Sequence, residues 1–99
     1  MLRPRKEAPT YPVIIPIKTN RGYGETRVIG PTRVTFATAA MFAAGEPLRF
    51  AMSLRGHGAT TLEVFCSGSV RAVATDGELF VIDASIEQTD IRLAEGEGD

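Results

Sequence analysis

One stretch of the chain decides the fold: residues 60–74, TTLEVFCSGSVRAVA, which read as a single long β-strand. Apolar and polar side chains alternate along it, which is typical of a strand with one buried face. The apolar face holds Leu62, Val64, Cys66 and Val70, and the polar face holds Glu63, Ser67, Ser69 and Arg71. Gly68 stands in the middle of this strand, where a residue without a side chain permits a bend or bulge. A long strand with a central bend favours a sheet that curls into a barrel.

Strand-like segments separated by turn residues lie on both sides of this stretch. We expect strands at residues 11–18, 25–29, 32–38, 48–54 and 78–86, the last extended by 88–93. Turn signals fall at Asn20-Arg21-Gly22-Tyr23-Gly24, Gly30-Pro31, Gly56-His57-Gly58 and Thr75-Asp76-Gly77. Residues 39–44 alone are rich in helix formers, so we expect at most a short helix there. The predicted fold is therefore all-β, a small six-stranded antiparallel barrel, because closure hides the sheet edges.

Length and composition predict one small globular domain. The chain has 99 residues, of which 43% are hydrophobic and 23% charged, an ordinary globular composition. We expect a flexible basic arm over residues 1–10, the barrel over 11–93 and an acidic disordered tail over 94–99. No apolar run approaches the roughly 18 residues of a membrane span, and the N-terminal residues lack the apolar core of a secretory signal. We therefore expect a soluble, cytoplasmic protein.

Charge is distributed unevenly, although the formal net charge is only -1. Residues 1–33 carry seven basic side chains against two acidic ones, and residues 76–99 carry eight acidic side chains against one arginine. A basic front half is suited to an anion such as a phosphate. The same distribution also fits opposite charges that face each other across the fold, and charge alone does not separate these two interpretations.

Catalytic groups are scarce, and the sequence indicates no enzyme. His57 lies between two glycines at a predicted hairpin tip, where nothing fixes it as a general base. Cys66 falls on the apolar face of its strand and is predicted to be a small buried side chain rather than a nucleophile. One histidine and one cysteine exclude a metal site built from several such residues. We expect no catalytic residues, no metal and no cofactor.

The overall layout resembles the PilZ domain, the small β-barrel module that reads cyclic di-GMP in bacteria. Four segments carry the resemblance: Tyr11-Pro12-Val13, Val34-Thr35-Phe36, Gly45-Glu46-Pro47-Leu48-Arg49-Phe50, and the stretch from Cys66-Ser67-Gly68-Ser69-Val70 to Gly77-x-x-Phe80. The resemblance spans residues 5–93 and implies a six-stranded PilZ-like barrel with a regulatory rather than an enzymatic role.

PilZ domains bind their ligand through two elements, and this chain departs from both. The first is Arg-x-x-x-Arg just before the first strand, where the resemblance places Lys6 and Thr10. The second is Asp/Asn-x-Ser-x-x-Gly after the second strand, where it places Val28, Gly30 and Arg33. Arginine forks match the edge of guanine and grip phosphate, and each such base contact is worth about 1–3 kcal/mol. Losing two of them weakens binding roughly a thousandfold.

The resemblance therefore implies a PilZ-like module of the cyclic di-GMP signalling type whose nucleotide binding is weak or lost. Any remaining site would use the basic side chains of Arg3, Arg5, Lys6, Arg27 and Arg33 to hold the phosphates. An alternative is an adaptor barrel that acts through protein contacts, for example in pilus or motility machinery. A further alternative, a barrel that binds single-stranded nucleic acid, needs exposed aromatics beside basic groups, and only Tyr23, between Arg21 and Arg27, fits.

Overall fold

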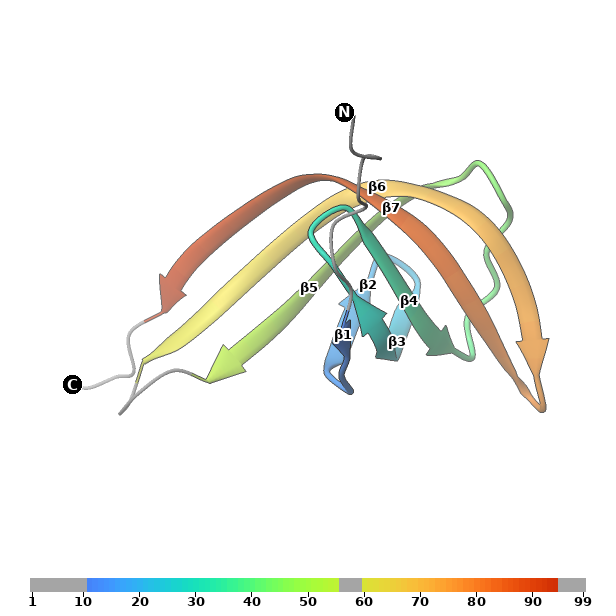
Figure 1. Cartoon of the computed structure of the whole chain (residues 1–99), viewed down its shortest axis with the longest axis horizontal. Helices are drawn as coiled ribbons and strands as arrows, with labels where there is room; N and C mark the ends of the chain where they lie inside the picture. Colours follow the sequence, from blue (N-terminus) through green and yellow to red (C-terminus); the bar gives the residue numbers. More distant parts are fainter. Residues whose placement is uncertain (1–10, 56–59, 95–99) are drawn as a thin grey trace, which may run out of the picture.

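The computed structural model describes residues 11–55 and 60–94. Within these ranges the chain is all-β and contains no helix, and therefore no helix that could cross a membrane. The seven strands, coloured along the chain in Figure 1, are β1 (Tyr11–Pro12), β2 (Pro16–Thr19), β3 (Gly22–Ile29), β4 (Arg33–Thr38), β5 (Pro47–Arg55), β6 (Thr61–Asp76) and β7 (Leu79–Ala94).

The sheet closes into a six-stranded antiparallel barrel, as predicted. Its order is β1-β3-β2-β5-β6-β7-β4, and an additional pairing of β3 with β4 closes the six strands β2 to β7 into a ring, with β1 attached outside it. β1 is an extra two-residue strand that pairs with Val28 and Ile29 of β3, while β2 pairs with the other end of β3 and with β5. Strand and turn signals predicted the antiparallel barrel but not this order, because β2 pairs with β5 and β4 pairs with β7, which are not consecutive in the chain.

The core is formed by the inward faces of the barrel strands. Its fully buried side chains include Ile17, Val34, Phe36, Leu48, Val70 and Ile82. Phe36 packs at its centre, with its ring 6.3 Å from that of Phe42 in an edge-to-face arrangement. Cys66 is buried in this core, as its phase with Val64 predicted. Desolvation raises the pKa of the Cys66 thiol, although the Thr89 hydroxyl lies 3.9 Å from its sulfur.

Gly68 is the point at which β6 bends, as its position predicted. The pairing of β6 with β7 shifts register between Ser67 and Gly68 and again between Val70 and Ala72. A Cβ atom at Gly68 would overlap the backbone carbonyl of Ser85 on β7. Only glycine permits so close an approach of two backbones, so this residue lets the long strand curl around the barrel.

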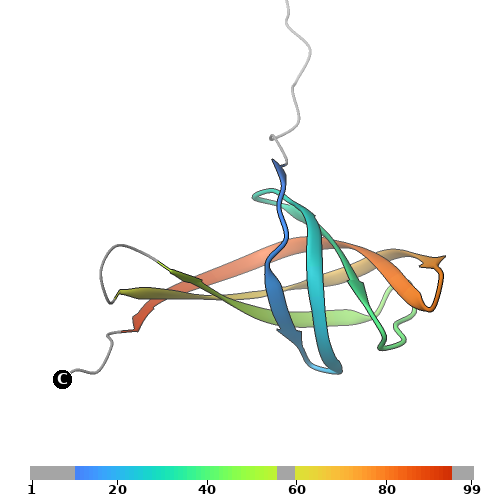
Figure 2. The same cartoon turned by 90° about the horizontal axis from the view of Figure 1, so that it is seen from below.

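β6 and β7 are longer than the barrel that they help to close. Their N- and C-terminal ends, respectively, run on beyond β2, β3 and β4 and carry the end of β5 with them (Figure 1). The same three strands project to the left in Figure 2. We call this part, residues 52–55, 61–66 and 88–94, the extension. The prediction that residues 88–93 prolong the strand at 78–86 is thereby confirmed.

Residues 39–44, where we expected at most a short helix, form none and belong to the loop between β4 and β5. The loop carries Phe42 into the core, where only 4% of its surface is exposed. A helix of one or two turns has little stability of its own, so burial of the Phe42 ring decides the conformation. The amide of Ala40 is bonded instead to the hydroxyl of Thr38, at 3.1 Å.

The strand expected at residues 11–18 is interrupted between β1 and β2. The buried hydroxyl of Thr26 occupies the interruption: it donates to the carbonyl of Val13 at 2.6 Å and accepts from the amide of Ile15 at 2.8 Å. One side chain thus satisfies backbone groups that a regular ladder would have paired.

Candidate functional site

The start of β1 lies beside the turn between β3 and β4, where the resemblance to PilZ domains places the second ligand element. Tyr11 lies opposite Ile29, and Pro12 lies opposite Val28, so the start of β1 runs beside the turn between β3 and β4. This turn is closed by a hydrogen bond of 2.8 Å from the amide of Gly30 to the carbonyl of Arg33. Lys6 and Thr10, like Arg3 and Arg5, lie outside the described residues.

The described positions of the second element present little that binds a nucleotide base. Val28 is a half-buried apolar residue within β3, and Gly30 is a half-buried residue of the turn. Arg33 is exposed at the start of β4, and its guanidinium grips Asp83 of β7 through two hydrogen bonds of 3.0 and 3.1 Å. A bidentate fork is the strongest geometry for such a pair, and a ligand would have to compete with Asp83 for it.

Arg27, the other tentative ligand residue on β3, is also paired. Its guanidinium lies 2.9 Å from the carboxylate of Asp76, at the end of β6. The acidic partners of Arg27 and Arg33 both belong to the acidic C-terminal region of the sequence. At these two arginines, opposite charges therefore face each other across the fold. In the described structure they do not converge on an open anion site.

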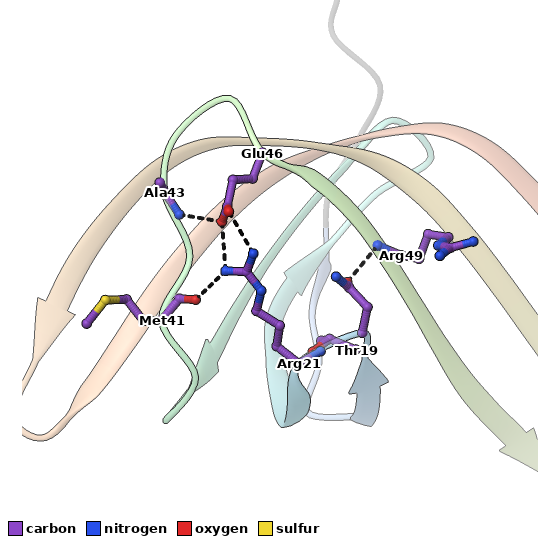
Figure 3. A network of polar contacts seen from close by, with 7 residues as sticks. Thr19, Arg21, Met41, Ala43, Glu46 and Arg49 are labelled. Carbon is purple, nitrogen blue, oxygen red and sulfur yellow. Dashed lines mark hydrogen bonds and ion pairs between the residues drawn. The ribbon is translucent and has the colours of Figure 1, made fainter.

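A third arginine, Arg21, binds the loop that carries Phe42 at one end of the barrel (Figure 3). Arg21 forms a bidentate pair with Glu46, at 2.7 and 2.9 Å, and donates to the carbonyl of Met41 at 2.8 Å. Its guanidinium lies 5.0 Å from the centre of the Phe42 ring. Glu46 also accepts from the amide of Ala43, and these bonds hold the pKa of its carboxyl below the ordinary value. The arrangement fixes the loop rather than offering a vacant site.

An open groove of about 730 Å³ crosses β5, β6 and β7, and sequence reasoning missed it. Its aromatic lining comes from Phe50 and Phe65, and its polar lining comes from Asn20, Arg49, Ser67, Gln88, Thr89 and Asp90. These residues are far apart along the chain, so only the pairing of the strands brings them together. One signal was present in the sequence, because Phe65 falls on the polar face of its strand, and it is 38% exposed.

The other residues considered in the sequence analysis form no recognisable binding or metal site within the described residues. His57 lies outside the described residues. No group of three metal-ligating side chains is found within residues 11–55 and 60–94. Tyr23 is 72% exposed on β3, but its neighbours Arg21 and Arg27 both hold carboxylates.

Comparison with known proteins supports the fold but does not identify a ligand. No protein-family model matches the chain, and a search of curated proteins finds no match. Among solved structures, the chain is similar to the inhibitor of motility MotI/DgrA of Bacillus subtilis, with a TM-score of 0.75 at 14% sequence identity. The likeness covers 89% of this chain and 45% of that one, so this chain spans less than half the length of MotI/DgrA. At this identity the likeness concerns the fold alone, which is a PilZ-like barrel.

Proposed function

We propose that this chain is a non-enzymatic bacterial regulatory module of the PilZ type whose binding of cyclic di-GMP is weak or lost. It works in the cytoplasm and passes its signal on through contacts with a protein partner. The observation that carries the proposal is the contrast between an intact frame and substituted ligand positions. The start of β1 and the β3–β4 turn lie side by side, yet Val28 and Gly30 offer no polar side chain there.

The ion pair of Arg33 supports the same conclusion. A phosphate at Arg33 would have to share the guanidinium with Asp83, which already accepts hydrogen bonds from its Nε and Nη2. Arg27 faces the same competition from Asp76. Any remaining attraction for the nucleotide then rests on the charges of Arg3, Arg5 and Lys6. Such attraction falls with ionic strength, because salt screens exposed charges.

The surroundings of Tyr23, the aromatic residue considered for base stacking, favour an adaptor role over nucleic-acid binding. Tyr23 is exposed and Lys18 lies opposite it on β2, but both nearby arginines are paired with carboxylates, so little unpaired positive charge surrounds it. Stacking platforms for single strands combine aromatics with unpaired positive charge. An adaptor has no such requirement, and MotI/DgrA, the structural neighbour, is an inhibitor of motility.

Calorimetric titration with cyclic di-GMP tests the proposal. The unmodified chain is expected to give weak or undetectable heat, and any binding should weaken strongly as salt is added. The variant that combines Lys6→Arg, Thr10→Arg, Val28→Asp and Gly30→Ser restores four motif positions. It should bind more tightly by a factor of about a thousand, the value of two restored contacts.

A matched control separates base recognition from added charge. The triple variant Lys18→Arg, Thr75→Arg, Ser53→Asp makes the same charge changes at exposed positions of β2, β6 and β5, away from the β3–β4 turn. It should leave the affinity unchanged. Tight binding by the unmodified chain that resists salt would contradict the proposal, since it would require direct base recognition by other residues.

A further inference from the structure

The outer edge of β7 is covered along one half of the strand and open along the other. From Phe80 to Ser85 the strand lies between β6 and β4, and the amide of Ile86 donates to the carbonyl of Thr32 at 2.9 Å. From residue 88 to residue 94, β6 is the only described strand that pairs with it (Figure 1). A strand edge of this kind presents unpaired amides and carbonyls to any further strand.

The open segment has one apolar and one polar face. The inner face carries Thr89, Ile91 and Leu93, which lie opposite Cys66, Val64 and Leu62 of β6. Ile91 is 61% exposed and Leu93 60% exposed, although both continue the apolar face of the core. The outer face carries Gln88, Asp90 and Arg92. Two large aliphatic side chains so exposed beside an open edge are typical of an interaction surface.

Two opposite charges of the outer face, Asp90 and Arg92, stand directly before and after Ile91 in the sequence. The Arg92 guanidinium lies 3.0 Å from the Asp90 carboxylate, with 66% and 61% of the two side chains exposed. An exposed pair within one strand contributes little to stability. Exchanging this ion pair for one with another strand therefore costs little, although the Arg92 guanidinium also lies 5.0 Å from the centre of the Phe65 ring.

We propose that two copies of this chain associate through residues 88–94 of β7, paired antiparallel about a two-fold axis at Ile91. In this register Ile91 lies opposite its own counterpart, and Asp90 of each copy lies opposite Arg92 of the other. Leu93 lies opposite Thr89, so the aliphatic side chains of both copies share one face. The two extensions form one continuous sheet.

Charge complementarity is the reason for choosing a second copy as the partner. An antiparallel strand reverses the order of residues, so a segment reading acid–Ile–base is complementary to itself. The open edge of β5 lacks this property, because Leu54 there lies between Ser53 and Arg55. Pairing β7 with β7 uses the same patch on both copies and therefore closes at a dimer instead of growing into a fibre.

The expected affinity is low. One strand pairing with a few side-chain contacts lies at the small end of specific interfaces, below about 1,200 Å² of buried surface. The dimer should therefore appear only as the concentration of the chain rises. The proposal rests on the β7 edge and not on the positions of the nucleotide motif, so it stands or falls independently of the proposed function.

Sedimentation velocity across a concentration series provides the first test. The chain should shift from its monomer mass of 10.6 kDa to twice that value. Asp90→Arg and Arg92→Asp each place like charges opposite one another and should each abolish the shift. The combined variant with both changes should restore it. A monomer at every concentration, larger open-ended species, or a dimer that survives either single change would overturn the proposal.

Mixing the two single variants sharpens this test. Asp90→Arg carries two arginines on the outer face and Arg92→Asp carries two aspartates, so each repels itself but complements the other. The mixture should form a dimer, and its failure to do so would contradict the antiparallel register. Glu25→Arg, which reverses an exposed charge on β3, is the control and should dimerise like the unmodified chain. Thermal unfolding of each variant verifies that it is folded.

Crosslinking tests the position of the axis. Residues at the two-fold point have their Cα atoms roughly 4.5–5.5 Å apart, within the range of a disulfide. Ile91→Cys should form a covalent dimer under a mild oxidant, while Leu93→Cys, which lies opposite Thr89, should not. The native Cys66 is buried and should not contribute. Equal crosslinking by both variants would reject the axis at Ile91.

Discussion

The strand β7 runs through both the barrel and the extension, but the solvent exposure of its apolar side chains differs between the two regions. Ile82, in the barrel, is fully buried, whereas Ile91, in the extension, is 61% exposed. Both are isoleucines on the inner face of the same sheet. The difference is that β7 lies between β6 and β4 at Ile82, inside a closed barrel, while at Ile91 the sheet is open along one edge. A flanking strand on each side, and not the type of residue, accounts for this difference, since Val64 of the extension lies between β5 and β7 and is buried.

The largest expected effect comes from preventing closure at Gly68. Gly68→Val places a branched side chain where the backbone of Ser85 lies, and β6 and β7 must then separate. We expect a loss of unfolding free energy of at least about 4 kcal/mol, which for a domain this small threatens folding itself. Urea denaturation monitored by circular dichroism measures the loss.

The control for this variant is Gly77→Ala in the β6–β7 turn. Gly77 has a φ of 65° but no neighbouring atom within 4 Å of an added Cβ. Only backbone strain should result, about 1–2 kcal/mol. Equal losses for the two glycine variants would show that crowding between β6 and β7 is not what Gly68 relieves.

A smaller effect distinguishes the two isoleucines directly. Ile82→Ala leaves a cavity in the barrel core and should cost about 3 kcal/mol. Ile91→Ala removes the same atoms from a largely exposed position and should cost less than about 0.5 kcal/mol. Urea denaturation at low protein concentration measures both values for the monomer. Similar losses at the two positions would mean that the extension is packed as tightly as the barrel.

The smallest effect concerns the two ion pairs, one in each region. Glu46→Gln removes the carboxylate that holds Arg21 and the amide of Ala43 at the barrel end, and it should destabilise the fold. Asp90→Asn breaks an exposed pair of the extension and should have no measurable effect on the monomer.

The effect of Glu46 depends on pH with a definite sign. Its pKa is lowered in the folded chain, so the folded state favours the carboxylate, and this contribution is present above the ordinary pKa of 4.5. It disappears as the pH falls through the lower folded value. The difference in stability between the unmodified chain and Glu46→Gln should therefore shrink on acidification below pH 4.5, as denaturation at successive pH values will measure. A difference that grows there would contradict the assignment.

Part of the candidate site was predictable from the sequence, because it depends on residue types at fixed positions. Val28 and Gly30 lack polar side chains in any conformation, so the loss of the second motif element could be recognised without a structure. The pairing of Arg33 with Asp83 could not, because β4 must first lie beside β7. The groove across β5, β6 and β7 was missed for the same reason, since Asn20, Phe65 and Gln88 meet only in the folded sheet.

The alternation of residues along each strand determined the all-β class, the buried face of β5 and β6, the burial of Cys66 and the bend at Gly68. These are local properties, because adjacent side chains of a strand must point to opposite faces and only glycine lacks a Cβ atom. Tertiary structure alone decided the rest. The pairing of β3 with β4 closes the barrel, Phe42 turns a helix-forming segment into a loop by entering the core, and Thr26 accommodates the break between β1 and β2. The open edge of β7 belongs to the same class, because a strand has a free edge only in relation to the strands that stop short of it.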